Sequence, residues 1–266
     1  MSQPFHFGDP ERMLFGVRHP AATASRAAML VCAPLLQDAI RCHRSLWSLA
    51  EALALAGTDV LRFDWFGSGD SDGDHADMSF DGLLADLRTA HAWLEAESGG
   101  LPVRMLAYRS AALPVLAQLA ESSVAPVDLV LWDPSLVGHA TVTDWRRQHV
   151  LQIRETGRYP RGGVVAERDE LLGFDVDPAF LDALAGVDAS DVCLPPDSRV
   201  RVAAWERTVE LERFTATQRA AGITVEEILL DPADRPAWLE PKVFEYQAFP
   251  RRSVAALARQ LAAEAA

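Results

Sequence analysis

The chain has little lysine and little cysteine, and it has no long hydrophobic run. Of its 25 basic residues only Lys242 is a lysine, and 38 acidic residues give a formal net charge of -13. Such an acidic chain is not expected to bind nucleic acid or an anionic membrane surface, because both require basic patches. The longest apolar run, near Ala27 to Leu36, is too short to span a bilayer.

Three widely spaced cysteines (Cys32, Cys42 and Cys193) fit neither a disulfide framework nor a zinc site. The first ten residues have no basic-then-apolar signal pattern. We therefore expect a soluble cytoplasmic protein with reduced thiols and no membrane span. A small-molecule acyl or anionic substrate is the expected partner, with nucleic acid excluded and a homodimer left open.

Strand and helix patterns alternate along most of the chain. Apolar runs typical of buried strands alternate with segments of helical periodicity, which predicts a parallel sheet with helices on both faces. The expected strands are Phe5–Phe7, Arg12–His19, Ala28–Cys32, Asp59–Phe63, Val103–Tyr108, Val127–Trp132, Arg199–Ala204 and Thr224–Leu230. The alternation stops at 135–196, which we interpret as a lid or cap inserted into a core made of 1–134 and 197–266.

The junction at Val103–Ala112 carries the most informative substitution. In an α/β-hydrolase, a strand that runs into a helix forms the nucleophile elbow, G-x-S-x-G, with the serine on a strained turn. The five positions here are Ala107 to Ala111, with Arg109 in place of the serine and alanines in place of both glycines. The sequence therefore predicts an α/β-hydrolase fold, with an eight-stranded, mostly parallel sheet, that lacks the usual reactive hydroxyl.

Several further motifs carry a family resemblance. They are Phe7-Gly8, Glu11-Arg12, Leu14-Phe15-Gly16, Cys32-Ala33-Pro34, Gln37-Asp38, Arg41-Cys-His-Arg44, Leu61-Arg-Phe-Asp-Trp-Phe-Gly-Ser-Gly-Asp-Ser-Asp-Gly73 and Leu129-Val-Leu-Trp-Asp-Pro134, with looser matches at Arg235-Pro-Ala-Trp238 and Phe249-Pro250. With these motifs the chain resembles the exosortase A system-associated hydrolases, relatives of the serine aminopeptidase-like group. Part of that family has Gly-Leu-Arg-Leu-Gly-Ala at the elbow, again with arginine at the nucleophile position. The resemblance implies a role beside exopolysaccharide or protein-sorting machinery.

The rest of a catalytic triad is incomplete as well. Hydrolysis on this fold needs a serine, an acid and a histidine in that chain order, and the histidine should follow the last strand. No histidine lies after His149, so no general base is expected there. Asp133 and Glu206 follow strands at positions where an acid could lie. Ser110 could act as nucleophile only if the elbow slipped by one residue.

Arg109 has two alternative roles. It could clamp an anionic group or an oxyanion at the helix N-terminus, or it could plug the pocket by pairing with Asp133. His43 follows a strand whose loop usually gives an oxyanion-hole donor, so it could face the pocket as a general base. Adjacent Cys42 diverges from it by about 100° on a helix and cannot form a dyad by adjacency alone.

No cofactor or metal is expected. Asp70, Asp72 and Asp74 have the spacing of a calcium loop, but His75 and Asp81 occupy positions that require Gly and Glu. The first functional hypothesis is therefore an enzyme acting on an acyl, ester or thioester substrate, by transfer, cyclisation or hydrolysis, with Arg109 as clamp. The alternatives are an inactive pseudo-hydrolase that binds a ligand or protein, and a serine hydrolase that uses Ser110.

Overall fold

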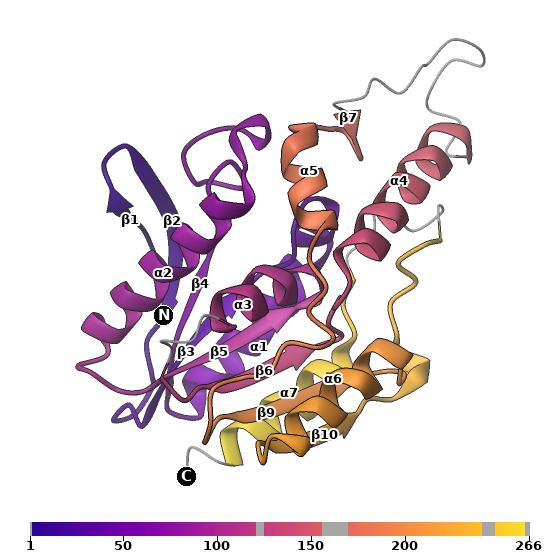
Figure 1. The fold of residues 1–266 in the computed structure, drawn as a ribbon. Helices are drawn as coiled ribbons and strands as arrows, with labels where there is room; N and C mark the ends of the chain where they lie inside the picture. The colour runs from indigo at the N-terminus through magenta and orange to yellow at the C-terminus, as the bar shows by residue number, and fades with distance from the viewer. Residues whose placement is uncertain (1, 121–124, 156–169, 241–247, 264–266) are drawn as a thin grey trace.

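A twisted eight-stranded sheet forms the centre of the computed structural model, which describes residues 2–120, 125–155, 170–240 and 248–263 (Figure 1). The strand order is β1-β2-β4-β3-β5-β6-β9-β10. Strand β2 runs antiparallel to both of its neighbours, β1 and β4, and all the pairs from β4 to β10 are parallel. The strands are β1 (Gln3–Asp9), β2 (Arg12–His19), β3 (Ala27–Cys32), β4 (Thr58–Phe63), β5 (Val103–Tyr108), β6 (Asp128–Trp132), β9 (Arg199–Ala204) and β10 (Thr224–Leu229).

Helices cover both faces of this sheet. Alternate residues of the buried strands enter two hydrophobic clusters, as the two-residue repeat of a strand requires; in β3, for example, Leu30 belongs to one cluster and Val31 to the other. On the Val31 side lie α1 (Gln37–Leu55) and α7 (Arg251–Ala263). On the Leu30 side lie α2 (Phe80–Glu97), α3 (Ala112–Leu119) and α6 (Val209–Ala220).

The segment between β6 and β9 lies outside the sheet. It contains α4 (Gly138–Glu155), the short strands β7 (Glu170–Leu171) and β8 (Phe174–Asp175), and α5 (Pro178–Ala185). Helices α4 and α5 lie side by side above the sheet (Figure 1). Part of the expected lid, 156–169, lies outside the described residues, and its role as a lid stays a prediction.

The predicted fold class is confirmed, with small differences at the element ends. The first strand is longer than the expected Phe5–Phe7, because pairing runs from Gln3 opposite Arg18 to Asp9 opposite Arg12, and the hairpin turns at Pro10-Glu11. After the elbow strand, a 3₁₀ turn, η2 (Arg109–Ala111), precedes α3. Within the part of the chain that the structure describes, none of the helices combines the length and apolar character that a membrane span requires.

Candidate functional site

Three neighbouring strands, β3, β5 and β6, end at the candidate site. Each is followed by a residue in the left-handed region that is not glycine: Leu36 (φ 54°), Arg109 (φ 50°) and Asp133 (φ 44°). Such residues cost on the order of 1–3 kcal/mol each and persist where the surrounding structure holds them. The strained turn of the elbow is therefore present, and Arg109 occupies it.

The Arg109 side chain lies between two carboxylates. Its Nε donates to Oδ2 of Asp38 at 2.8 Å, and its Nη1 donates to Oδ2 of Asp133 at 3.1 Å. The side chains of Arg109 and Asp38 are only 16% and 2% exposed. Asp38 belongs to the first turn of α1, after β3, and Asp133 follows β6. The strand order thus places one acid on each side of the central arginine.

Electrostatics keep this arginine charged. Burial opposes the charge of the guanidinium, but Asp38 and then Asp133 outweigh burial and raise the pKa of Arg109 above its ordinary value. The two carboxylates hold Arg109 as a charged group, and Arg41 adds a second positive charge near Asp38.

Trp238 covers the guanidinium from a third side. The Arg109 Cζ lies 4.0 Å from the centroid of the Trp238 ring, and the Cζ of Arg41 lies 5.0 Å from the same ring. Arg41 also donates from Nη1 to the Trp238 carbonyl oxygen at 3.0 Å. Trp238 follows β10, the last strand, which is where the fold would supply its catalytic histidine. A tryptophan held between two guanidiniums lies there instead.

Ser110 is not available as a nucleophile in this conformation. Its side chain is buried, and its Oγ accepts the backbone N–H of Leu35 at 2.9 Å. Leu35 lies in the β3–α1 loop, from which α/β-hydrolases take an oxyanion-hole donor. The Leu35 N–H, which lies where an oxyanion-hole donor would be expected, is thus already bonded to the serine hydroxyl. No histidine in the described residues forms a hydrogen bond with Ser110.

A cavity of about 260 Å³ opens beside Arg109. Its lining comes mostly from the start of α4 and from the β6–α4 loop, with Thr208 and Glu210 at the start of α6. Gln148 on this lining is buried, and its Nε2 has no hydrogen-bond partner within the described residues.

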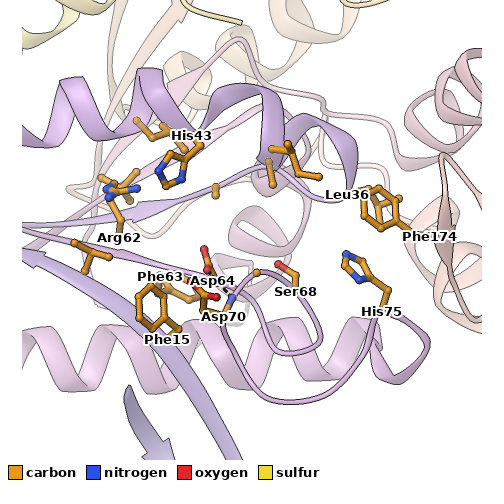
Figure 2. Close-up of a pocket in the computed structure, with 17 residues that line it drawn as sticks. Phe15, Leu36, His43, Arg62, Phe63, Asp64, Ser68, Asp70, His75 and Phe174 are labelled. Carbon is orange, nitrogen blue, oxygen red and sulfur yellow. Dashed lines mark hydrogen bonds between the residues drawn. The ribbon is translucent and has the colours of Figure 1, made fainter. Parts of the chain in front are cut away.

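A second cavity, of about 490 Å³, lies between α1 and the loop after β4; we call it the α1 cavity (Figure 2). Its walls are mainly apolar, and its polar residues are His43, Arg62, Asp64, Ser68, Asp70 and His75. His43 reaches it from α1, opposite Asp64 and Ser68 (Figure 2). Arg109 does not line it, so the structure separates His43 from Arg109.

Other candidate residues lie elsewhere. Glu206 is exposed and accepts two hydrogen bonds from Arg235, at 2.6 and 2.8 Å, so it forms a surface ion pair. Cys42 is fully buried, and burial raises the pKa of its thiol well above the ordinary value, which removes it as a nucleophile. His149 is buried and accepts the N–H of Leu172 at 3.0 Å through Nδ1. No cluster of three or more metal-ligating side chains occurs in the described ranges.

Sequence reasoning missed Asp38, Arg41 and Trp238 as neighbours of Arg109. All three belong to the motifs that carry the family resemblance. Their shared presence in these motifs could have marked them as candidates. They lie far apart along the chain, however, so the sequence does not show that they converge on one guanidinium. Pairing with Asp133 was one of the two roles predicted for Arg109, and this ion pair is present.

Comparisons with known proteins agree with the fold. No protein-family model matches the chain, and no curated protein matches it either. Among solved structures, Est1E from Butyrivibrio proteoclasticus with bound ferulic acid has a TM-score of 0.66 at 12% identity, covering 98% of this chain and 97% of that one. A thermostable carboxyl esterase from Bacillus coagulans has a TM-score of 0.65 at 9% identity, covering 100% and 99%.

A monoglyceride lipase from Saccharomyces cerevisiae, in complex with a substrate analog, is similar as well. Its TM-score is 0.64 at 10% identity, and the alignment covers 99% of this chain and 94% of that one. These identities are low, so the likeness concerns the arrangement of the backbone. The chain has the α/β-hydrolase fold.

Proposed function

We propose that this protein is a non-hydrolytic pseudo-hydrolase that uses the α/β-hydrolase fold to bind a small molecule. The observation that carries the proposal is the arrangement around Arg109. An ion pair to Asp38, a second to Asp133 and the ring of Trp238 occupy the space in which a serine, a base and a substrate carbonyl would meet. The elbow is a structural plug, and the ligand binds in a neighbouring cavity.

The absence of a base supports this proposal independently. A serine alcohol attacks an ester only when a neighbouring group accepts its proton. The sequence has no histidine after His149, and the residue that reaches the elbow from the last strand is Trp238, which cannot accept a proton. Arg109→Ser alone therefore supplies a hydroxyl without a base.

The segment 135–196, with α4 and α5 above the strand ends, supports ligand binding as a lid. Phe174 of this segment lines the α1 cavity, and Trp145 and Gln148 line the cavity beside Arg109. An inserted segment of this length in a compact domain is usually functional. A lid over two cavities fits a protein that encloses a small molecule.

The proposal is tested by separating binding from turnover. Wild-type protein and Arg109→Ser are each incubated with a series of p-nitrophenyl esters and acyl thioesters of increasing chain length, and product is measured along with the thermal midpoint. We expect both proteins to remain at the background rate of hydrolysis, with at least one compound raising the midpoint. Turnover by the wild-type protein above background would contradict the proposal.

A second function is favoured by the 260 Å³ cavity beside Arg109. The protein would then be an enzyme that processes an acyl, ester or thioester group without a covalent intermediate, with the guanidinium and Gln148 binding the carbonyl oxygen. Preorganised donors of this kind are worth on the order of 10²–10³ in rate. This function predicts turnover in the wild-type protein that Arg109→Met and Gln148→Leu each abolish.

A further inference from the structure

The α1 cavity contains two groups of opposite charge that do not pair with each other. Arg62 and Asp64 are two residues apart on and just after β4, so their side chains point to the same side of the sheet. Both line the cavity. Burial lowers the pKa of Arg62, and the charges of Asp64 and Glu51 oppose that shift only in part. No ion pair joins Arg62 to Asp64 in the described structure.

The Arg62 guanidinium is held at one end only. Its Nε donates to Nε2 of His19 at 3.1 Å, and His19 in turn contacts Oε1 of Glu51 through Nδ1 at 2.6 Å. This buried chain orients the guanidinium and requires a neutral His19, consistent with burial, which lowers the pKa of that histidine. The two terminal amino groups of Arg62 have no hydrogen-bond partner among the described residues, and Arg62 lines the cavity.

Asp64 is likewise held through one oxygen. Its Oδ2 accepts the N–H of Asp70 at 3.1 Å, and the loop approaches so closely that a Cβ on Gly69, whose φ is 61°, would collide with this oxygen. The Oδ1 atom has no hydrogen-bond partner within the described ranges. Burial raises the pKa of Asp64, as expected for a carboxylate that lacks a full set of donors.

The apolar walls are suited to the body of a ligand rather than to its charges. They are formed by side chains from β2, β3, α1, β4 and β8: Phe15, Val17, Val31, Leu36, Ile40, Leu46, Phe63 and Phe174. The volume of about 490 Å³ lies within the range of small-molecule sites. A ligand that fills it would bury an apolar group of the size of an aromatic ring.

We propose that the α1 cavity binds an apolar α-amino acid, with the ligand carboxylate on Arg62, its ammonium group on Asp64, and its side chain against the apolar walls. A zwitterion satisfies both residues at once. A simple carboxylate would face Asp64 and Asp70, and a simple amine would leave the guanidinium of Arg62 buried beneath it without an anion. This inference rests on the proposed function, which makes the protein a ligand-binding one.

The test is isothermal titration calorimetry with L-phenylalanine as the probe, compared with 3-phenylpropionic acid and 2-phenylethylamine. We expect L-phenylalanine to bind at least tenfold more tightly than either analogue, because each lacks one charged contact. Arg62→Gln and Asp64→Asn should each weaken binding by tenfold or more. Arg44→Gln and Asp72→Asn are the matched controls, since both residues are exposed and neither lines the cavity, and they should bind like wild type.

Ala39→Phe covers the case in which Arg62→Gln fails to fold. Ala39 is half-buried on the cavity wall, so the larger ring fills the cavity while the charged residues stay in place. We expect this variant to fold and to lose L-phenylalanine binding. No heat of binding with wild-type protein, or equal binding by wild type and Ala39→Phe, would overturn the inference. Ester binding without turnover, together with no heat of binding from L-phenylalanine, would overturn the inference and leave the proposed function standing.

Discussion

Replacing Arg109 by methionine tests whether this residue is a structural plug. Methionine keeps much of the side-chain length but removes the positive charge from between Asp38 and Asp133. The Asp38 side chain is 2% exposed, so its carboxylate would lose the guanidinium that it pairs with and would keep only the attraction of nearby Arg41. Removing one partner of a buried ion pair typically costs about 3–5 kcal/mol. For a domain of this size, each kcal/mol corresponds to about 2–4 °C in the thermal midpoint.

We therefore expect Arg109→Met to lose about 3–5 kcal/mol of unfolding free energy and about 6–20 °C in thermal midpoint. Urea denaturation followed by circular dichroism gives the first quantity, and a thermal scan gives the second. Arg235→Met is the matched control, because Arg235 forms a two-point ion pair with Glu206 that is exposed on both sides. A surface pair is worth about 0–1 kcal/mol, so this control should change little.

The double variant Arg109→Met with Asp38→Asn separates the charge effect from the packing effect. It removes the stranded carboxylate together with the guanidinium, so we expect it to be more stable than Arg109→Met alone. A loss below about 1 kcal/mol in Arg109→Met, equal to that of the Arg235 control, would show that Arg109 is not a structural plug. Arg109 would then be a free group available to a ligand, as the enzyme hypothesis requires.

Three other predictions concern single residues. Ser110→Ala should lower the unfolding free energy by about 1–3 kcal/mol, because the buried N–H of Leu35 loses its acceptor; an unchanged denaturation midpoint would contradict this. Gln148→Leu should raise the unfolding free energy by about 1 kcal/mol, because a buried amide without a partner is removed; a clear loss would indicate an interaction of Gln148 that the cavity does not reveal. Burial lowers the pKa of His19 in the folded state, so the unfolded chain binds the proton first, and stability should fall as the pH drops below about 6.5. His19→Gln should reduce that slope when unfolding is measured between pH 8 and pH 5.5, and a slope equal to that of wild type would contradict the assignment.

The fold could be predicted because local patterns determined it. Val103–Tyr108 and Arg199–Ala204 are strands rich in apolar residues, and their predicted ends agree with the structure. Element ends are less predictable. The positive φ at Arg109 begins a 3₁₀ turn before α3, which periodicity alone does not reveal.

The site was predictable only in part. The substitution at Arg109, the absence of a late histidine and the proximity of Asp133 all follow from motif positions on a known topology. The approach of Asp38 and Trp238 to the same guanidinium depends on how α1 and the segment after β10 pack, which no local pattern encodes. For the same reason, His43 lines the α1 cavity and not the cavity beside Arg109.

The most direct test of the plugged elbow is the reaction of the folded protein with a fluorophosphonate probe, followed by intact-mass measurement. An active serine hydrolase gains one adduct, because the probe reacts with an activated serine. We expect an unmodified mass for the wild-type protein, since Ser110 is buried and its Oγ accepts a hydrogen bond from the N–H of Leu35. A stoichiometric adduct that maps to Ser110, and that is absent from Ser110→Ala, would contradict it.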